Sequence, residues 1–395
     1  MSDLQSIVEK RLGEIIEVRH RLHQIPELGY EETKTAAQIR GELDRLGIEF
    51  VGGVRGAPTA TIAMIGDQTR PCVALRADID ALPIQENTGL PYASQHPGRM
   101  HACGHDGHAA NLVGAAAVLK EIERELPVCV KLIWQPAEEN GGGAKKLVDA
   151  GVLDGRIGPK VDAIFGLHGW PEMRVGTVST RPGGLLASMD SFHATFIGQG
   201  AHGAYPHLGR DPIAAAAEAV LSLQQIVSRE VDPTDSAVVT VGQFHAGTAV
   251  NIIPERATIA GTVRALNDET RKKLEVSIRR RLGAAATAGQ CQLEFDWHAG
   301  YPALVNDPAM ADYVQRIVQS ALGDNAYIPS ARPSMGAEDF AYYLQKVPGC
   351  FILIGVAPQG QDSNPGVHTD RYDFTDAALE VGMKLFVELA RNYRT

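Results

Sequence analysis

Apolar and polar positions in the first part of the chain form two patterns. Short, almost continuously apolar runs predict buried strands, and longer stretches with an apolar residue every three or four positions predict helices. The predicted strands are residues 59–65, 72–76, 128–134 and 162–167. The predicted helices are residues 107–124 and 143–150. Strands of this kind separated by helices are typical of an α/β domain whose sheet carries helices on both faces.

The middle of the chain has a different order of elements. Its pattern predicts strand 190–197, helix 212–229, strands 237–244 and 256–264, helix 268–288 and strand 291–297. The order β-α-β-β-α-β is that of a ferredoxin-like α+β domain, which is complete in itself. The elements after it return to the first pattern, with helix 308–321, strand 351–355 and helix 376–393. The sequence therefore predicts an α/β domain made of residues 1–185 and 299–395, interrupted by an inserted domain at 186–298.

Composition and charge exclude several classes of protein. Apolar residues make up 44% of the chain and charged residues 21%, as in ordinary globular proteins and unlike disordered ones. The 37 Lys and Arg residues against 47 Asp and Glu residues give a net charge of −10, which argues against a nucleic-acid-binding protein. The five cysteines include no C-x-x-C pair, so neither a disulfide framework nor a cysteine-rich zinc ribbon is expected. The pattern contains no signal peptide and no apolar run of membrane-spanning length, so we expect a cytoplasmic protein without a membrane partner.

The densest group of polar side chains is the segment MHACGHDGH, residues 100–108, at the start of the Ala-rich predicted helix. Cys103 and His105 are two positions apart, so a tight loop can direct a thiolate and an imidazole at one ion. These donors favour zinc or a neighbouring transition metal over calcium or magnesium. A complete site needs ligands from elsewhere in the chain. The alternative for any single residue of the segment is an ordinary core or surface position.

Two adjacent glutamates, Glu138 and Glu139, follow the predicted strand that ends at Trp134. Ligands of α/β folds bind at the carboxyl ends of strands. Because adjacent side chains of an extended segment point in different directions, one carboxylate can bind a metal ion while the other faces the reacting water. The glycine-rich stretch behind them lets the backbone approach a site closely. The alternative is an ordinary solvated pair of glutamates.

Further candidate residues follow other predicted strands. Asp78 and Asp80 lie in the segment RADIDALP, at the end of a buried strand where an acid is costly unless it is paired. They either accept hydrogen bonds from metal-bound histidines or form a turn before Pro83. His168 and His368 each lie in a loop after a strand. With the cysteine, histidine and glutamate donors above they make five ligands, enough for a two-metal centre.

Residues 198–203, GQGAHG, match the dinucleotide-binding pattern G-x-G-x-x-G. That pattern requires a helix to begin at the loop, so that the N-terminus of the helix meets the pyrophosphate. Here the next predicted helix begins only near Asp211. We therefore do not assign nucleotide binding to this loop. His202 stands among its glycines, where another molecule can approach the imidazole closely.

Taken together, these segments resemble the peptidase M20 superfamily of metal-dependent amidohydrolases. The resemblance is to the branch of hippurate hydrolases, N-acyl-L-amino-acid amidohydrolases and auxin-conjugate hydrolases, and it covers nearly the whole chain. It rests on the segments RADIDALP, MHACGHDGH, WQPAEE, GLHGWP, GQGAHGAYPH, NIIPE, GTVR, GAEDFAYY and HTDRYDF. Two departures from the family pattern are the Thr369-Asp370 pair after His368 and Asn140 within the glycine-rich stretch. Both bear on substrate preference, because neither removes a ligand.

The resemblance implies a catalytic domain that holds two divalent metal ions per subunit, either zinc, manganese, cobalt or nickel. It also implies an inserted domain that acts as a lid and forms a homodimer or homotetramer. The implied metal ligands are Cys103, His105, Glu139, His168 and His368. The other implied site residues are Glu138 as general base, Asp80 as the residue that orients a ligand, His202 as a lid histidine that reaches the scissile carbonyl from the partner subunit, and Asn251 and Arg264 as substrate contacts.

The implied reaction is hydrolysis of the amide bond of an N-acyl amino acid, either hippurate-like or N-acetylated, to a carboxylate and a free amino acid. In this reaction Glu138 takes a proton from the attacking water. One alternative is a catalytically silent, metal-stabilised binding protein. The other, from the glycine pattern, is a nucleotide-dependent oxidoreductase. Glu138 and His202 favour the enzyme, because a pure binding protein needs neither a base nor a lid histidine.

Overall fold

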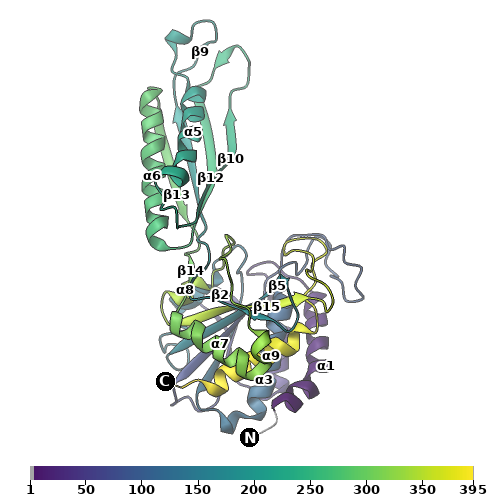
Figure 1. Ribbon diagram of the computed structural model, residues 1–395. Helices are drawn as coiled ribbons and strands as arrows, with labels where there is room; N and C mark the ends of the chain where they lie inside the picture. Colours follow the sequence, from purple (N-terminus) through teal and green to yellow (C-terminus); the bar gives the residue numbers. More distant parts are fainter. Residues whose placement is uncertain (1–3, 395) are drawn as a thin grey trace. The chain divides into compact units, whose positions relative to one another are not determined.

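A computed structural model describes residues 4–394 of the chain, which form two compact units (Figure 1). Unit 2 consists of residues 184–305 and 332–338, and unit 1 contains the remaining described residues. The predicted inserted domain, 186–298, lies within unit 2. Within residues 4–394, no helix is long and apolar enough to cross a membrane.

Unit 1 is built on a seven-stranded mixed sheet with the order β1-β2-β4-β3-β5-β15-β6. Its strands are β1 (Phe50–Val54), β2 (Ala57–Ile65), β3 (Cys72–Asp78), β4 (Cys129–Gln135), β5 (Ala163–Arg174), β6 (Val178–Ser179) and β15 (Gly349–Ala357). The four central strands β4, β3, β5 and β15 are parallel, and β1, β2 and β6 are antiparallel to their neighbours. Their carboxyl ends therefore meet at one edge of the sheet, where ligands of α/β folds bind.

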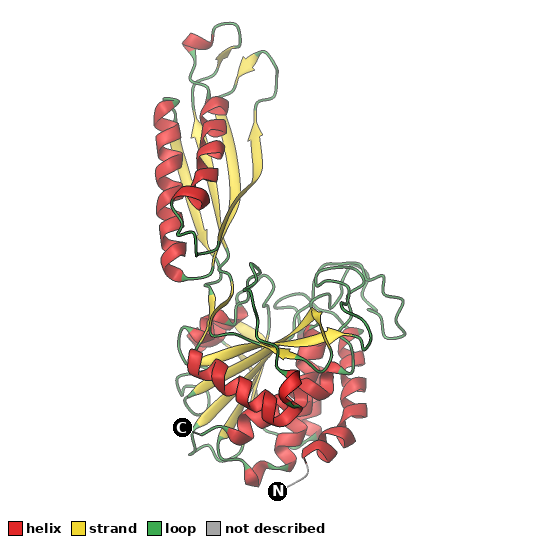
Figure 2. Cartoon of the chain, in the orientation of Figure 1, coloured by secondary structure: helices red, strands yellow, loops and turns green. Residues whose placement is uncertain are grey.

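Helices cover both faces of this sheet, as Figure 2 shows in red. They are α1 (Leu4–His23), α2 (Thr33–Arg45), α3 (His105–Glu121), α4 (Gly143–Ala150), α7 (Pro308–Leu322), α8 (Ala341–Leu344) and α9 (Ala378–Asn392), with short 3-10 turns at 123–125 and 324–326. Side chains of β4 alternate between the faces. The Trp134 indole donates to Ala109 O of α3, whereas the Lys131 ammonium, on the opposite face, donates to three carbonyls of the segment after α4. The α/β fold class predicted from the sequence is confirmed.

The helix that begins at the Cys/His segment, α3, is buried along almost its whole length. Its many alanines and its glycines allow neighbouring elements to approach closely. A Cβ at Gly107 would lie 2.3 Å from the Phe374 ring, and one at Gly114 would lie 2.6 Å from the Met383 sulfur. The small residues of α3 therefore hold the helix, and the donors at its N-terminus, in a fixed position.

Unit 2 contains the predicted β-α-β-β-α-β order. It is formed by β8 (Asp190–Ile197), α5 (Pro212–Arg229), β10 (Ala237–Ala246), β12 (Arg256–Ala265), α6 (Asp268–Ala288) and β13 (Gln292–Ala299). The antiparallel sheet has the order β10-β12-β8-β13, and α5 and α6 pack on one of its faces. Two short strand pairs and one turn complete the secondary structure of this part of the chain. The strand pairs are β9 (Ala201–His202) with β11 (Ile252–Ile253) and β7 (Gly183–Leu186) with β14 (Leu304–Asn306), and the 3-10 turn is at 206–208.

The glycine loop at residues 198–203 does not lead into a helix. The loop contains β9, and α5 begins only at Pro212, where the Asp211 carboxylate accepts the backbone N–H of Ile213. The N-terminus of α5 is therefore capped by a side chain of the protein itself, and the helix does not begin at the glycines as phosphate binding by this motif requires.

A buried ionic cluster joins α1 to α3 behind the Cys/His segment. Asp106 Oδ2 lies 3.0 Å from Arg19 Nε and 2.9 Å from His23 Nδ1, and His23 Nε2 lies 3.3 Å from Glu86 Oε1. Burial alone would lower the pKa of His23, but the carboxylates of Asp106 and Glu86 outweigh it and raise the pKa to about 9. His23 is therefore a cation at neutral pH, held between two acids.

This cluster predicts a pH dependence of stability. Since folding raises the pKa of His23 above its ordinary value of 6.5, its contribution to the free energy of unfolding is complete below pH 6.5 and is lost as the pH rises through about 9. The variant His23→Gln, which does not titrate, should lose less stability over the same interval. Urea unfolding of both proteins at about pH 6 and about pH 10 measures the difference. Equal losses in the two proteins would contradict the prediction.

Candidate metal centre

The candidate ligands of unit 1 gather at the carboxyl edge of the sheet. Asp78 ends β3 and lies opposite Gln135, the last residue of β4, with Glu138 and Glu139 just beyond. The sequence predicted His168 in a loop after a strand, but His168 lies within β5. Gly166 of β5 pairs with Arg76 of β3, so His168, two residues after Gly166, is level with Asp78. Because β3, β4 and β5 are parallel, these side chains reach one edge together.

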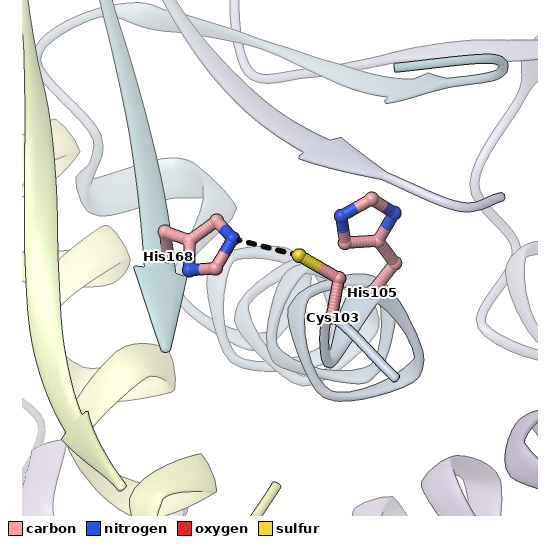
Figure 3. Close-up of side chains that lie close together, drawn as sticks. All are labelled: Cys103, His105 and His168. Atoms are coloured by element: carbon pink, nitrogen blue, oxygen red, sulfur yellow. Dashed lines mark hydrogen bonds between the residues drawn. The ribbon is translucent and has the colours of Figure 1, made fainter. Parts of the chain in front are cut away.

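Three donors face one another at this edge (Figure 3). Cys103 Sγ lies 3.3 Å from His168 Nε2. His168 Nδ1 lies 2.8 Å from the Gly169 carbonyl oxygen, to which it donates, so Nε2 presents a lone pair toward the thiol. His105 lies in the first turn of α3, and its Nδ1 is 3.2 Å from Asp80 Oδ1. This contact orients the imidazole so that the Nε2 of His105 faces the other donors.

A second group of three donors adjoins the first and shares Cys103 with it. It consists of Cys103, Glu139 and His368, whose ligand atoms lie within 4.8 Å of one another. His368 Nε2 lies 3.2 Å from Glu139 Oε1, and His105 Nε2 lies 3.9 Å from the same oxygen. Cys103 is therefore the donor that the two groups share. All five predicted ligands are therefore brought together within unit 1.

The residues present fit a divalent metal pair. The buried His105 Nε2 has no hydrogen-bond partner within residues 4–394, an unusual state for a buried polar atom. Burial and the carboxylates of Glu139 and Glu138 raise the pKa of the Cys103 thiol well above its usual range, so the thiolate form needs a cation beside it. Burial and His108 lower the pKa of His168 to about 3, which keeps that imidazole neutral as a ligand must be. Sulfur, nitrogen and oxygen donors in this combination suit transition metals.

Asp80 connects the two halves of the centre. Its Oδ1 accepts the backbone N–H of Glu138 at 3.1 Å and also contacts His105, and its Oδ2 accepts the N–H of Glu139 at 3.0 Å. One buried carboxylate thus orients an imidazole and the backbone of both glutamates. This is the geometry of a residue that orients ligands without binding the metal itself.

Asp80→Asn is expected to weaken metal binding by about 10–100-fold. The asparagine side chain has only one acceptor oxygen, whereas both oxygens of Asp80 accept hydrogen bonds from the glutamate backbone. The measurement is a titration of the metal-free protein with zinc and with manganese, in competition with a chelator of known affinity. The exposed Asp67→Asn is the control and should leave both affinities unchanged. If the Asp80→Asn variant bound both metals with wild-type affinity, Asp80 would have no role in orienting the metal ligands.

The comparisons with known proteins agree with this centre. A family model described as Peptidase family M20/M25/M40 matches residues 74–392. The chain is 40% identical over 383 residues to the IAA-amino acid hydrolase ILR1-like 4 of Arabidopsis thaliana, which covers 96% of this chain and 85% of that protein. It is 43% identical over 351 residues to the N-acetyl-L-cysteine deacetylase of Bacillus subtilis, covering 89% of this chain and 81% of that protein. The chain belongs to this peptidase family.

A solved structure extends the family relationship to the whole fold. The YXEP protein of Bacillus subtilis, described as a dinuclear metal-binding peptidase of the M20 family, matches the chain with a TM-score of 0.83 at 37% identity, covering 97% of this chain and 98% of that one. Together with the two groups of donors in unit 1, this shows that the M20 protein is a metal-dependent amidohydrolase and supports two divalent ions per chain.

Sequence reasoning left His108 without a role, and the structure assigns it one in this M20 centre. His108 Nδ1 donates to Asp78 Oδ1 at 2.7 Å, and its Nε2 accepts the backbone N–H of Gly169 at 2.9 Å. Both nitrogens are therefore occupied, so His108 supports β5 next to His168 instead of binding metal. Its position three residues after His105, one helical turn along the same motif, is the signal that could have found it.

Two residues of the M20 centre have strained backbone. Ala137, which precedes Glu138, has φ of +54°, and His368 has φ of +62°, both in the left-handed region that residues other than glycine seldom adopt. The His368 N–H donates to Ala102 O at 2.7 Å, which ties this ligand to the loop that carries Cys103. Such strain persists only where surrounding contacts hold it, and it is typical of functional positions.

The predicted substrate residues lie in unit 2 and occupy two places within it. His202 and Asn251 are neighbours, since β9 pairs with β11 and the Gly203 N–H donates to Asn251 O at 2.8 Å. Both side chains are exposed. Arg264 lies on β12 of the four-stranded sheet, opposite Val238 of β10. This is the end of the sheet farther from the separate β9–β11 pair, and the Arg264 guanidinium is half-buried. Unit 2 by itself therefore brings together only two of these three residues.

Proposed function

We propose that this M20 amidohydrolase cleaves the amide bond of N-acyl amino acids, releasing a carboxylate and a free amino acid. The observation that carries the proposal is the anchoring of Glu138 and Glu139 on the same Asp80 carboxylate. Because Asp80 fixes the backbone of both glutamates beside the metal donors, we propose that Glu139 binds metal and that Glu138 transfers protons. The names of two relatives, an IAA-amino acid hydrolase and an N-acetyl-L-cysteine deacetylase, support this substrate class.

The residues of the chain have distinct roles in the proposed reaction. Two divalent ions held by the five donors, which we propose are zinc, manganese, cobalt or nickel, would lower the pKa of a water molecule and polarise the amide carbonyl. Glu138, 6% exposed, takes a proton from the attacking water and returns it to the leaving nitrogen. Asp80 holds the backbone of that base while the proton moves.

Residues of unit 2 are proposed to contact the substrate. The His202 Nδ1 accepts the N–H of Ala204 at 3.1 Å, so the neutral imidazole carries its proton on Nε2 and can donate it to a carbonyl oxygen as negative charge develops there. Asn251 and Arg264 are proposed to bind the remainder of the substrate, with the guanidinium suited to a carboxylate. A homodimer or homotetramer formed through unit 2 also stays a prediction.

Chelation tests the proposal directly. Dialysis against a chelator should abolish hydrolysis of N-acyl amino acids, and readdition of one of the four metals should restore it, because the donors and the base are in place without the ion. The assay is a panel that crosses acetyl, benzoyl and indole-acetyl groups with several amino acids, together with metal analysis of the purified chain. A metal-free protein with full activity would refute the metal centre. A fully loaded protein that binds but hydrolyses no member would favour the silent binding protein.

A further inference from the structure

Three successive peptide N–H groups beside the metal centre are held by buried carboxylates from elsewhere in the chain. Asp80 accepts the N–H groups of Glu138 and Glu139, as described above. The N–H of Ala137, just before them, donates to Glu32 Oε1 at 2.9 Å. Ala137 is the residue with φ of +54°, so Glu32 contacts the strained peptide that determines the direction in which the chain enters the glutamate pair.

Capping of α2 does not account for the burial of the Glu32 side chain. It stands at the N-cap position of α2, but its side chain makes no capping hydrogen bond. The Glu27 carboxylate caps that helix instead, accepting the N–H groups of Lys34 and Thr35 at 2.8 and 2.9 Å. Glu32 is 0% exposed, and its second oxygen accepts the hydroxyl of Thr59 at 2.7 Å. A carboxylate that could have remained in solvent is therefore directed at the Ala137 peptide.

The surroundings of Ala137 are shaped to keep it in one conformation. Its carbonyl accepts the N–H groups of Gly141 and Gly143 at 3.2 and 3.1 Å. A Cβ at Gly141 would lie 2.7 Å from the Ala137 Cβ, and one at Gly29 would lie 3.0 Å from it. Tyr30, whose φ is +65°, donates its hydroxyl to Gly141 O at 2.8 Å. Strain of this kind is maintained only by contacts, and the Glu32 hydrogen bond holds the N–H side of the peptide.

We propose that Glu32 is a positioning residue of the hydrolysis, which acts through the Ala137 peptide to aim the Glu138 carboxylate. This inference rests on the proposed role of Glu138 as general base. Burial raises the pKa of Glu32 to about 7, but a protonated carboxyl group still has an acceptor oxygen for the Ala137 N–H. The side-chain amide of a glutamine keeps one acceptor oxygen for the Ala137 N–H, and its NH2 group can donate to the Thr59 hydroxyl oxygen in place of the bond that the second oxygen accepts.

The test compares Glu32→Leu, which removes the acceptor, with Glu32→Gln, which keeps it. Glu32→Leu should lower kcat by about a hundredfold, the cost of a displacement of the base by about 1 Å, with KM and bound metal unchanged. Glu32→Gln should restore kcat to within a few-fold of the wild type. The neighbouring exposed Glu31→Gln is the control and should behave as the wild type. An unchanged kcat in Glu32→Leu, or a loss of metal from it, would overturn the inference.

A double variant separates this inference from the proposed function. If Glu32 acts only through Glu138, Glu32→Leu should cause no further loss when Glu138 is already Gln, since coupled residues are not additive. A full additional hundredfold loss would overturn the inference. Full activity in the single variant Glu138→Gln would instead refute the role of Glu138 as general base, whatever the result for Glu32. Should Glu32→Leu not fold, Ala137→Gly loosens the same peptide, and there an unchanged kcat with bound metal retained would count against the inference.

Discussion

Glu138→Gln is expected to lower kcat for N-acyl amino acid hydrolysis by about 10²–10⁴-fold while the protein keeps its metal. A glutamine has nearly the same shape and can still accept the Asp339 N–H, which lies 3.3 Å from Glu138 Oε1. It cannot take a proton from water at neutral pH. The loss should therefore appear in kcat rather than in folding, and steady-state kinetics with metal analysis of the same sample measure both.

The matched control for this variant is Glu49→Gln, which removes the same charge from an exposed position. It should retain wild-type kcat. The neighbouring Glu139→Gln should differ from Glu138→Gln by losing metal as well as activity, because Glu139 contacts His368 among the donors. If Glu138→Gln retained turnover, the general base would have to be reassigned. If it lost metal too, Glu138 would be a ligand instead.

Arg76→Met is expected to lower the free energy of unfolding by about 3–5 kcal/mol, the largest stability effect that we predict for a single substitution. Arg76 is fully buried in β3 and donates to Asp78 at 2.7 Å, to Gln135 at 2.8 Å and to Asp339 at 3.0 Å. Methionine fills much of the same volume but leaves two buried carboxylates without this cation. Denaturant unfolding of the metal-free protein measures the difference without a contribution from bound metal.

The exposed Arg156→Met gives the comparison, since Arg156 pairs with Asp154 at 2.7 Å but both side chains are more than half exposed. Its removal should change stability by less than about 1 kcal/mol, as for most surface ion pairs. A similarly small loss in Arg76→Met would show that Asp78 and Asp339 are stabilised by the remaining hydrogen bonds of the cluster. Arg76 would then be unnecessary for the fold of the centre.

Much of the secondary structure could be predicted from the sequence. Strand 190–197 and helices 212–229 and 268–288 were predicted with the observed bounds, because their apolar spacing is regular and their ends carry turn or capping residues. Helix α2 and strand β1 were not predicted. The edge strand β1 contains two glycines and is only partly buried, so it shows little of the alternation that marks a strand.

The candidate metal donors were predicted as residue types, but their partners were not. A Cys/His segment and a glutamate pair contain residue types that bind metal ions, so the sequence identifies them as candidate donors. The supporting contacts of Arg76 and Glu32 have no comparable signal, and the spacing of His108 from His105 indicates a shared helix face but not the partners of His108. Each of these residues acts on a segment tens of residues away in sequence, and its role is visible only where the chain brings the two together.

The sequence by itself determined which residues have the chemistry of a metal-dependent hydrolase, and the order of strands and helices that carries them, because periodicity and side-chain type are local properties. Only the tertiary structure decided that Cys103 joins two groups of donors, that Asp80 anchors both glutamates, and that His108 supports the sheet instead of binding metal. The physical reason is that a histidine or carboxylate can be a ligand, a hydrogen-bond partner or a buried ion. The choice among these is made by the atoms that the fold places within about 3 Å of it.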